Sequence, residues 1–416
     1  MSVEARSFLF LQGPPGPFFA QLARRLETEG HQCHRVNFNG GDRLSWPAPA
    51  VDFRGTIGDW PARFEGLVRS RQITDIVLYG DCRPLHRVAC RMAGPLGARI
   101  HVFEEGYIRP DWVTLERDGV NGFSTLPRHP AVYLRLAETV PPLPDHPPIP
   151  SSFRLRAREA LVYFVGTWLL AVRYPGFRSH RPYSAAAELG GWMRKLLCRP
   201  IARRRAARAF ARLGSRPYFM LPLQLDSDHQ IRTHSPFAGM ADAIATIVAS
   251  FAAHAPGDCV LLVKEHPLDN GIHNWRRTIE RLARSFGIAD RILYVAHGDL
   301  YSMIAAATGV VTVNSTTGTL ALAHGTPVAV LGNAVYDLPG VTHQGTLDQF
   351  WTEPGKPQVE IYDAYRRVLA ATCLLRGGFS SRDGRAHLLP AAAARLCAGQ
   401  AWTGTLDVEP YARAEA

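Results

Sequence analysis

Residues 7–38 read SFLFLQGPPGPFFAQLARRLETEGHQCHRVNF, a pattern of strand, turn, helix and strand. SFLFLQ is a short apolar run typical of a buried strand, and GPPGP supplies the turn that follows it. The next segment places Phe18, Leu22 and Leu26 on one face of a helix that ends at Gly30. HQCHRVNF then forms a second strand, so the pattern predicts a βαβ unit on a parallel sheet.

The same alternation continues along most of the chain. In the first third it gives strands at DIVLYG (75–80) and ARIHVF (98–103), with a helix near 84–94. It resumes with the strands PYFMLPLQL, CVLLVKEHP, RILYVAHG, GVVTVNS and PVAVLG, which begin at residues 217, 259, 291, 309 and 327 and are separated by helices. Ligands bind at the carboxyl ends of the strands in such sheets. We therefore expect an α/β, GT-B-like fold, with two doubly wound Rossmann-type domains facing across a cleft.

The length of 416 residues fits two domains, and the expected division has four segments. The proline-rich stretch 127–150 is predicted to contain no regular helix or sheet. The predicted segments are an N-terminal α/β domain (1–150), a basic and aromatic connector that is helical or lies near a membrane (151–214), a C-terminal α/β domain (215–375) and a helical tail (376–416).

The net charge of +11 favours anionic partners. These include an acidic membrane surface, a sugar nucleotide and an acidic glycan. Nucleic acid is disfavoured because the arginines gather in 199–212 and are not interleaved with aromatic residues along a groove. The seven cysteines are scattered and never in C-x-x-C spacing, which suggests neither a disulfide framework nor a zinc site. The N-terminus does not resemble a signal peptide, so we expect a cytoplasmic protein.

The segment ALVYFVGTWLLAV (160–172) is apolar and is flanked by arginines at 154, 156, 158 and 173. It is shorter than the roughly 20 residues that span a bilayer. One interpretation is a helix in the membrane interface, with Tyr163 and Trp168 at headgroup depth and the arginines on anionic lipid. A buried core helix with arginines at its ends explains the pattern equally well.

Two adjacent carboxylates, Glu104 and Glu105, end the strand ARIHVF and are followed by Gly106. Catalytic groups gather at the carboxyl ends of parallel strands, and the glycine permits a sharp turn there. Like charges side by side raise the pKa of one of them, which suits a base or a nucleophile. The alternative is a solvated loop with two ordinary glutamates.

Lys264, His266 and Pro267 end the strand CVLLV in the second half of the chain. A histidine held by the following proline can donate a hydrogen bond to a phosphate, and Lys264 adds charge, although a surface loop explains the motif as well. A second group, Ser315, Thr316, Thr317 and Gly318, lies between a strand and a helix. Hydroxyls and amides at a helix start favour an anion, whereas a plain helix cap needs only one hydroxyl.

Several other loops follow strands. Each can be an ordinary turn or a loop that contacts the substrate. None matches G-x-G-x-x-G or G-x-x-x-x-G-K-[ST], so dinucleotide and ATP chemistry are disfavoured. Arg232 is suited to a bidentate pair with a carboxylate or phosphate. The candidate substrate-binding residues are Gly13, Pro14, Pro15, Asn39, Asp42, Asp81, Arg83, Arg109, Gln224, Asp226, Arg232 and Ser235.

Blocks in this order resemble the capsular polysaccharide export and biosynthesis family of the KpsS/LipB type: FLQGPPGPFF, RVNFNGGD, YGDCRPLH, VFEEGYIRPDWVTLE, QLDSDHQIRTHSPF, KEHP and NSTTGTLALAHGTPV. The resemblance runs from Phe8 to about Trp351. It implies a β-Kdo transferase, peripheral on the cytoplasmic face of the Gram-negative inner membrane, that moves Kdo from CMP-Kdo to a (lyso)phosphatidylglycerol-type lipid. Its implied partners also include a companion Kdo polymerase and the capsule export machinery.

The resemblance also implies roles for the candidate residues. Glu104 or Glu105 becomes the catalytic carboxylate of the first domain, on the acceptor side. His266, with Lys264 and Pro267, contacts the CMP phosphate, and residues 315–318 hold it from the other side. No cofactor and no metal are expected, because Asp226-Ser227-Asp228 falls in a block that the resemblance treats as metal-free. Family analogy favours retention, which makes the carboxylate a nucleophile.

Two other functions remain open from the sequence. The basic and aromatic middle segment also suits a non-catalytic membrane component of capsule assembly or export. A sugar-nucleotide 2-epimerase of GT-B fold is a third and weaker hypothesis, because the second domain does not otherwise resemble that family.

Overall fold

The computed structural model describes residues 5–144, 146–150, 152–178, 183, 185–226 and 229–398. The chain forms two compact units, and each draws on separate parts of the sequence. The first unit contains the chain up to Pro127, Val140–His180 and the chain from Arg367 onward. The second contains Arg128–Thr139 and Arg181–Arg366.

A seven-stranded sheet in the order β12-β6-β5-β4-β1-β2-β3 forms the core of the first unit. Strands β1 to β5 are parallel, and β6 runs antiparallel to both β5 and β12. The strand order reverses between β1 and β4, which is where doubly wound sheets bind ligands. The strands are β1 (Ser7–Phe10), β2 (Gln32–Asn37), β3 (Val51–Asp52), β4 (Asp75–Tyr79), β5 (Arg99–Glu105), β6 (Trp112–Arg117) and β12 (Leu374–Arg376).

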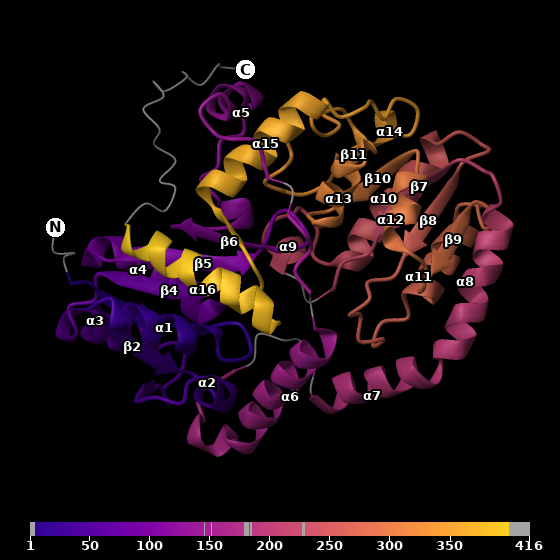
Figure 1. The fold of residues 1–416 in the computed structure, drawn as a ribbon. Coiled ribbons are helices and arrows are strands. Elements are labelled where there is room, and N and C mark those ends of the chain that lie inside the picture. Colours follow the sequence, from indigo (N-terminus) through magenta and orange to yellow (C-terminus); the bar gives the residue numbers. More distant parts are fainter. Residues whose placement is uncertain are drawn as a thin grey trace. The chain divides into compact units, whose positions relative to one another are not determined.

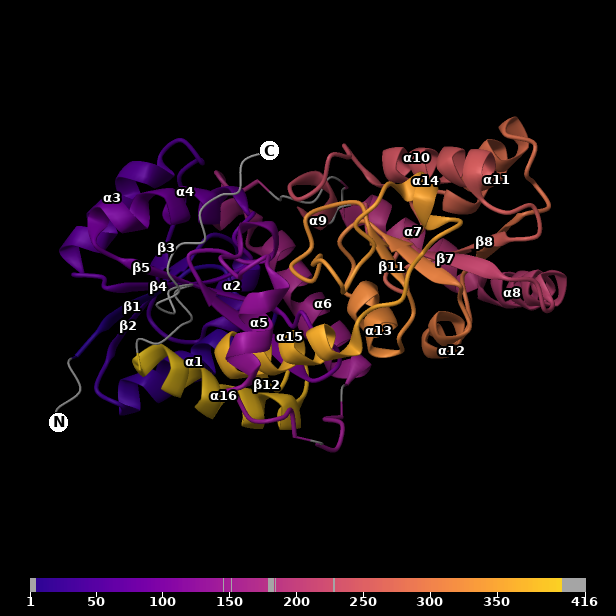
Figure 2. The same ribbon diagram turned by 90° about the horizontal axis from the view of Figure 1, so that it is seen from above.

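Helices cover both faces of this sheet. Figure 2 shows α3 and α4 on one face and α1 and α16 on the other. Phe18 of α1 packs edge-on against Phe103 and Phe379, with ring centroids 5.4 and 5.0 Å apart, within a cluster of buried aromatic residues. The helices are α1 (Phe18–Thr28), α2 (Gly40–Ser45), α3 (Trp60–Ser70), α4 (Pro84–Ala93), α6 (Phe153–Leu169) and α16 (Arg382–Cys397), with 3-10 turns η1 (Gly94–Leu96), η2 (Asn121–Phe123) and η3 (Ala171–Arg173).

The second unit has five parallel strands in the order β11-β10-β7-β8-β9, and its order reverses between β7 and β10. Helices α10 and α11 lie on one face of the sheet, and α12 and α13 lie on the other (Figure 2). The strands are β7 (Tyr218–Pro222), β8 (Val260–Lys264), β9 (Ile292–Val295), β10 (Gly309–Thr312) and β11 (Val328–Val330). The helices are α5 (Pro130–Ala137), α7 (Ala185–Leu197), α8 (Arg199–Leu213), α9 (His229–Arg232), α10 (Met240–His254), α11 (Trp275–Ser285), α12 (Leu300–Ala305), α13 (Thr317–Ala323), α14 (Leu347–Phe350) and α15 (Val359–Thr372).

The predicted fold class is confirmed: each unit is a doubly wound Rossmann-type sheet, and two in tandem make a GT-B-like chain. That the two sheets face one another across a cleft stays a prediction. The boundaries differ from those expected. The described part of 151–214 contains α6, α7 and α8 (Figure 1), but α6 belongs to the first unit and α7 and α8 to the second. The segment after 376 returns to the first unit as α16.

The prediction that 127–150 contains no regular structure is wrong, because α5 occupies Pro130–Ala137. Pro130 stands at the start of this helix, where the missing N–H has no intrahelical partner to lose. The ring of Tyr133 is fully buried 5.2 Å from that of Tyr365, so packing also stabilises the helix.

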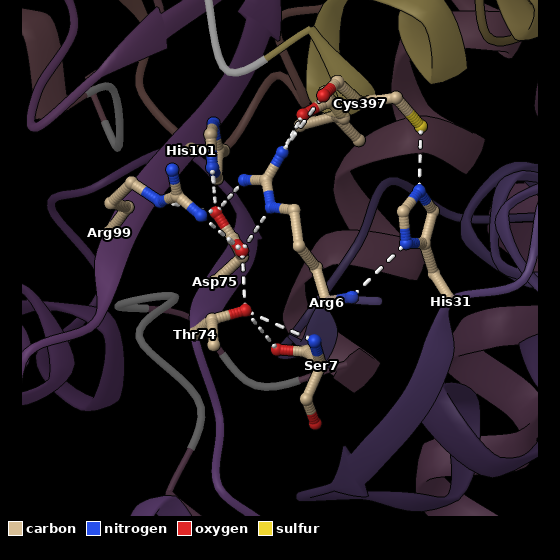
Figure 3. Close-up of polar contacts among 9 residues, drawn as sticks. Arg6, Ser7, His31, Thr74, Asp75, Arg99, His101 and Cys397 are labelled. Atoms are coloured by element: carbon tan, nitrogen blue, oxygen red, sulfur yellow. Dashed lines mark hydrogen bonds and ion pairs between the residues drawn. The ribbon is translucent and has the colours of Figure 1, made fainter. Parts of the chain in front are cut away.

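At the amino ends of the first unit's strands, a buried charge cluster surrounds Asp75 (Figure 3). The Arg6 Nε donates to Asp75 Oδ2 over 2.8 Å, and Arg99 Nε lies 3.0 Å from Asp75 Oδ1. His101 Nε2 lies 2.7 Å from the same Oδ1. Arg6 also donates through Nη1 to the carbonyl oxygen of Leu396 at the end of α16. The cluster therefore joins β1, β4 and β5 to the C-terminal helix, on the edge of the sheet opposite the strand ends where ligands bind.

Acid is expected to weaken the first unit through His101. Burial lowers the pKa of His101 below its ordinary value of 6.5, despite the nearby Asp75 carboxylate, and Nδ1 has no hydrogen-bond partner among the described residues. As the pH falls, His101 becomes protonated in the unfolded chain before it does so in the folded chain. The contribution of neutral His101 to stability is therefore complete above pH 6.5 and is lost as the pH falls toward the folded pKa. Lowering the pH from about 7.5 to about 5.5 should cost about 1 kcal/mol of unfolding free energy.

Urea unfolding at the two pH values measures this loss, and a His101→Gln variant serves as the control. The variant should lose less stability than the unmodified chain over the same pH interval, since it has no imidazole to protonate at this position. An equal loss in both proteins would contradict the assignment to His101.

Candidate active site

Glu104 and Glu105 occupy the carboxyl end of β5, as the sequence predicts, and Glu105 is held by two arginines. Its Oε2 lies 3.2 Å from Arg109 Nη1, and its Oε1 lies 3.2 Å from Arg156 Nη2. Arg109 follows in the next loop, whereas Arg156 comes from α6. Glu104 Oε1 accepts the backbone N–H of Glu105 over 2.9 Å. Glu105 is thus fixed as an ion-paired carboxylate, beside Glu104.

Glu104 lies over the end of β4, beside the point where the strand order reverses. Gly80 there has φ +67°, and a Cβ added to it would lie 3.4 Å from Glu104 Oε2. Burial raises the pKa of the Tyr79 hydroxyl well above its usual range, and the negative charges of Glu105 and Glu104 raise it further. The Arg83 guanidinium lies 5.5 Å from the centre of the Tyr79 ring.

We call Tyr79, Arg83, Glu104, Glu105, Arg109 and Arg156 the carboxylate cluster. In this cluster three arginines accompany two glutamates. The site can therefore present a carboxylate to a reacting carbon and still attract an anionic substrate.

Asn39 and Asp42, two predicted substrate-binding residues, are buried beside the end of β2 and have protein partners. Asn39 accepts the Asp42 N–H over 2.9 Å and so caps α2. Asp42 Oδ2 accepts from the Phe38 N–H at 3.0 Å and from Gln12 Nε2 at 3.2 Å. Tyr163 of α6 donates to Asp42 Oδ1 over 3.1 Å. These polar groups attach α6 to the ends of β1 and β2.

Asp81, Gly13 and the two prolines after it form the remaining predicted loops of the first unit. Asp81 is buried, and its Oδ2 accepts the Val120 N–H over 2.9 Å. Burial raises the pKa of this carboxyl. A Cβ on Gly13 would lie 2.7 Å from Phe19 Cδ2, so close packing requires glycine there. Pro14 is buried and Pro15 is half-buried. In the structure Asp81 and Gly13 contact the protein itself.

His266 follows β8 and is half-buried. Its Nδ1 accepts the Leu268 N–H over 3.1 Å, so the neutral ring carries its proton on Nε2. Asp269 holds the loop by accepting the Gly271 N–H at 2.7 Å and the Trp275 Nε1–H at 3.0 Å. Pro267 is exposed. This tautomer makes Nε2 a donor suited to a phosphate oxygen.

Lys264 differs from the other predicted phosphate ligands because its ammonium group is engaged within the protein. The residue is 8% exposed, and Nζ donates to the carbonyl oxygens of Glu265 at 2.9 Å and Ala296 at 3.3 Å. Burial lowers its pKa. The neighbouring Glu265 forms an ion pair with Lys195 of α7, at 2.7 Å. These contacts give Lys264 and Glu265 a structural role at the ends of β8 and β9.

Ser315, Thr316, Thr317 and Gly318 follow β10, beside the strand-order reversal of the second unit. Ser315 Oγ donates to Thr317 Oγ1 over 3.0 Å and accepts the Thr317 N–H over 3.1 Å. The Tyr336 hydroxyl donates to the Ser315 carbonyl over 2.6 Å, and a Cβ on Gly318 would lie 2.3 Å from that hydroxyl oxygen. Thr316 is the N-cap of α13 and makes no capping bond through its side chain, whereas the Ser315 hydroxyl contacts the first amide of the helix.

The polar segment after β7 likewise makes contacts inside the unit. Gln224 Oε1 accepts the Asn314 N–H over 3.0 Å and so joins the ends of β7 and β10. Asp226 accepts the Met240 N–H at 3.1 Å, at the start of α10, and pairs with Arg232 at 3.3 Å. Ser235 Oγ donates to the Ile231 carbonyl over 2.5 Å.

The structure therefore divides the predicted residues into two kinds. Glu104, Glu105, Arg83 and Arg109 come together in the carboxylate cluster. In the second unit, His266 follows β8 and residues 315–318 follow β10, and these two strands flank β7. Asn39, Asp42, Asp81, Gln224, Asp226 and Lys264 bind the protein itself. Sequence reasoning missed Arg156 and Tyr163 as parts of the site, because both lie on α6, far along the chain from the strand ends that they contact. The arginines that flank 160–172 are the sequence feature that could have indicated Arg156, but they are equally consistent with contacts to anionic lipid.

The model of the capsule polysaccharide biosynthesis protein family matches residues 74–380, a range that contains the carboxylate cluster, His266 and residues 315–318. The chain belongs to this family.

Two capsule polysaccharide proteins are similar to this chain over nearly their whole length. The capsule polysaccharide export protein KpsS of Escherichia coli is 37% identical over 372 residues, which cover 88% of this chain and 95% of KpsS. The capsule polysaccharide modification protein LipB of Neisseria meningitidis serogroup A is 35% identical over 395 residues, or 91% of this chain and 93% of LipB. Membership of the capsule biosynthesis family therefore applies to the full two-unit chain.

Among solved structures, the β-Kdo 2,7 transferase of Thermosulfurimonas dismutans KpsC aligns over 94% of this chain and 98% of its own. Its sequence identity is 15% and the TM-score is 0.46. Among the described residues of this capsule biosynthesis protein, none of the helices has the length and apolarity required to cross a membrane.

Proposed function

We propose that this capsule biosynthesis protein is a glycosyltransferase that moves Kdo from CMP-Kdo to a (lyso)phosphatidylglycerol-type lipid, and so begins the β-Kdo linker of a capsular polysaccharide. The observation that carries the proposal is the carboxylate cluster. It places two glutamates and three arginines at the carboxyl ends of β4 and β5, in a family of capsule biosynthesis proteins.

The charges of this cluster suit an acidic sugar. CMP-Kdo carries a phosphate and a sugar carboxylate, so a catalytic carboxylate must approach an anionic donor. Arg83, Arg109 and Arg156 offset that repulsion, and guanidinium groups bind carboxylates in a bidentate manner. A neutral sugar would not require such an excess of cations.

We assign the chemical step to Glu104 and a positioning role to Glu105. The two ion pairs of Glu105 fix its orientation, whereas Glu104 lies over the end of β4. In the proposed retaining reaction, Glu104 attacks the anomeric carbon and CMP leaves with the electrons of the broken C–O bond. An acceptor hydroxyl then attacks the same carbon and gives its proton to solvent, while the Glu104 carboxylate leaves with the electrons of its ester bond to the sugar.

We assign donor phosphate binding to His266, assisted by Ser315, Thr316 and Thr317. The hydrogen bond from Leu268 to Nδ1 favours the tautomer that donates from Nε2. Neither a metal nor a cofactor enters the proposed steps, since CMP is a good leaving group and an oxocarbenium-like sugar needs mainly charge stabilisation.

A His266→Ala variant is expected to lose about 100-fold in kcat/KM for CMP-Kdo, because it removes a hydrogen bond to a charged phosphate and its transition state. His387→Ala, an exposed histidine on α16, is the matched control and should retain full activity. The release of CMP at several donor concentrations measures both values. Unchanged turnover in His266→Ala would remove this residue from the site.

The overall reaction is tested by incubating the purified protein with CMP-Kdo and lysophosphatidylglycerol. The proposal predicts release of CMP together with an acceptor whose mass increases by one Kdo residue. If the protein binds anionic vesicles but leaves CMP-Kdo intact, it is a non-catalytic component of capsule assembly. Formation of an epimer from UDP-N-acetylglucosamine would instead identify a 2-epimerase.

The lipid acceptor also sets the proposed location and partners. We place the protein peripherally on the cytoplasmic face of the inner membrane, where both a nucleotide sugar and a phospholipid are present. A companion Kdo polymerase would extend the product before the export machinery receives it.

A further inference from the structure

Helix α6 exposes apolar side chains on its outer face. Trp168 is 72% exposed, and Val172, in the turn that follows, is 93% exposed. Viewed along the helix, the outer face begins with two exposed arginines and continues with apolar side chains at spacings of three or four residues. We call this surface the outer face; it consists of Arg154, Arg158, Leu161, Val162, Val165, Trp168, Leu169 and Val172.

The inner side of the same helix is polar and binds the protein. Arg156 pairs with Glu105, and the buried Glu159 pairs with Arg385 of α16 over 2.8 Å. Further along, Tyr163 donates to Asp42, and Thr167 Oγ1 donates to Asn39 Oδ1 over 3.2 Å. Close backbone packing adds to these bonds, since a Cβ on Gly40 would lie 2.0 Å from the carbonyl oxygen of Gly166. The inner contacts therefore leave the apolar side of the helix facing outward.

This polarity is the reverse of that expected for a helix on the surface of a water-soluble protein, which turns its apolar side to the core. A contiguous exposed apolar surface of this kind marks an interaction site. The helix has 17 residues, about 25 Å at 1.5 Å per residue, and arginines occupy its first two turns. Such a helix is suited to lie along an interface rather than to cross a bilayer.

We propose that the outer face docks on a lipid bilayer that contains anionic phospholipid. Leu161, Val165 and Trp168 enter the boundary between headgroups and acyl chains, and Arg154 and Arg158 contact lipid phosphates. A second copy of the chain fits this surface less well. A two-fold contact brings identical patches together, so the arginines would lie against either the partner's arginines or its apolar side chains, and neither arrangement supplies a counter-ion.

The docking surface extends the proposed function, on which its biological meaning rests. The helix that contacts lipid with its outer face also presents Arg156 to Glu105 with its inner side. A lipid acceptor would then reach the carboxylate cluster from the membrane without leaving the bilayer as a monomer. The two faces of α6 thereby connect the membrane surface with the acceptor side of the site.

Sedimentation with phosphatidylglycerol-containing vesicles, in the absence of any sugar nucleotide, tests the proposal. The triple variant Leu161→Ser, Val165→Ser and Trp168→Ser should bind these vesicles at least about tenfold more weakly. Its matched control changes three exposed apolar residues elsewhere, Ile57→Ser, Phe286→Ser and Val359→Ser, and should bind as the unmodified chain does.

Replacing Arg154 and Arg158 by glutamine should weaken binding to phosphatidylglycerol vesicles about thirtyfold and leave the weak binding to phosphatidylcholine vesicles unchanged. Glutamine at the exposed Arg24 and Arg281 provides the charge-matched control. Equal vesicle binding by the serine variant and its control would overturn the proposal. So would a dimer that dissociates in the serine variant while vesicle binding stays absent. Vesicle binding is independent of the sugar-transfer reaction, so Glu104→Gln should still bind vesicles. A lack of sugar transfer would therefore contradict the proposed function and not the docking surface.

Discussion

Replacing Glu104 by glutamine is expected to reduce Kdo transfer by about a thousandfold or more, and to do so in kcat rather than in KM. Glutamine keeps the size of the side chain and can still accept the Glu105 N–H, so local folding should be preserved. It cannot form the bond to the anomeric carbon that the proposed mechanism requires. The measurement is the release of CMP under saturating CMP-Kdo and lysophosphatidylglycerol.

Glu105→Gln provides the comparison within the same pair. It breaks the ion pairs with Arg109 and Arg156, so we expect a loss of about 10- to 100-fold that includes a higher KM for the acidic donor. The exposed Glu27→Gln on α1 should have no effect. If Glu104→Gln remains active while Glu105→Gln has no activity, Glu105 performs the chemical step and Glu104 has the positioning role. If both remain active, the chemistry lies elsewhere.

Replacing Asp75 by asparagine should destabilise the first unit by about 3–5 kcal/mol, the largest effect on stability that we expect. The fully buried carboxylate neutralises Arg6 and Arg99 and accepts a hydrogen bond from Thr74 Oγ1 over 2.7 Å (Figure 3). Asparagine retains the shape but removes the negative charge, so Arg6 stays buried without its counter-ion. Urea unfolding measures the loss of free energy.

Two further variants show whether charge is the cause. Arg6→Met in the Asp75→Asn background should recover part of the stability, because it removes the uncompensated cation. Asp290→Asn, at an exposed position of the second unit, should change stability little. Hydrogen exchange should show lost protection in β1, β4, β5 and α16 for Asp75→Asn. A loss confined to the second unit would be incompatible with the role assigned to this cluster.

The strand pattern was predictable because both sheets are mostly parallel and buried on two faces. Runs such as DIVLY (75–79) and VLLVK (260–264) are apolar and short, and the residues after them necessarily reach the carboxyl ends of the sheet. That reasoning correctly placed Glu104, Glu105 and His266 at strand ends. It could not give the antiparallel β12, which pairs with β6 only after the chain returns from the second unit.

Side-chain roles were less predictable than positions. Asp42 and Gln224 stand at strand ends, as substrate ligands do, but their partners are Tyr163 in one case and the Asn314 amide in the other. Such contacts depend on which distant segment packs nearby. The polar inner side of α6 was not predictable for the same reason. The segment 160–172 is almost entirely apolar, and the sequence does not show that Tyr163 within it and Glu159 before it bind partners in the protein.

The contact between Arg6 and the end of α16 also bears on how the chain is made. Arg6 leaves the ribosome long before its acceptors at Leu396 and Cys397, and α1 packs on that same later helix. Residues 181–366, by contrast, can assemble their five parallel strands beforehand. The apolar face of α1 therefore lacks its partner in the nascent polypeptide until residues 382–397 of α16 have been synthesised.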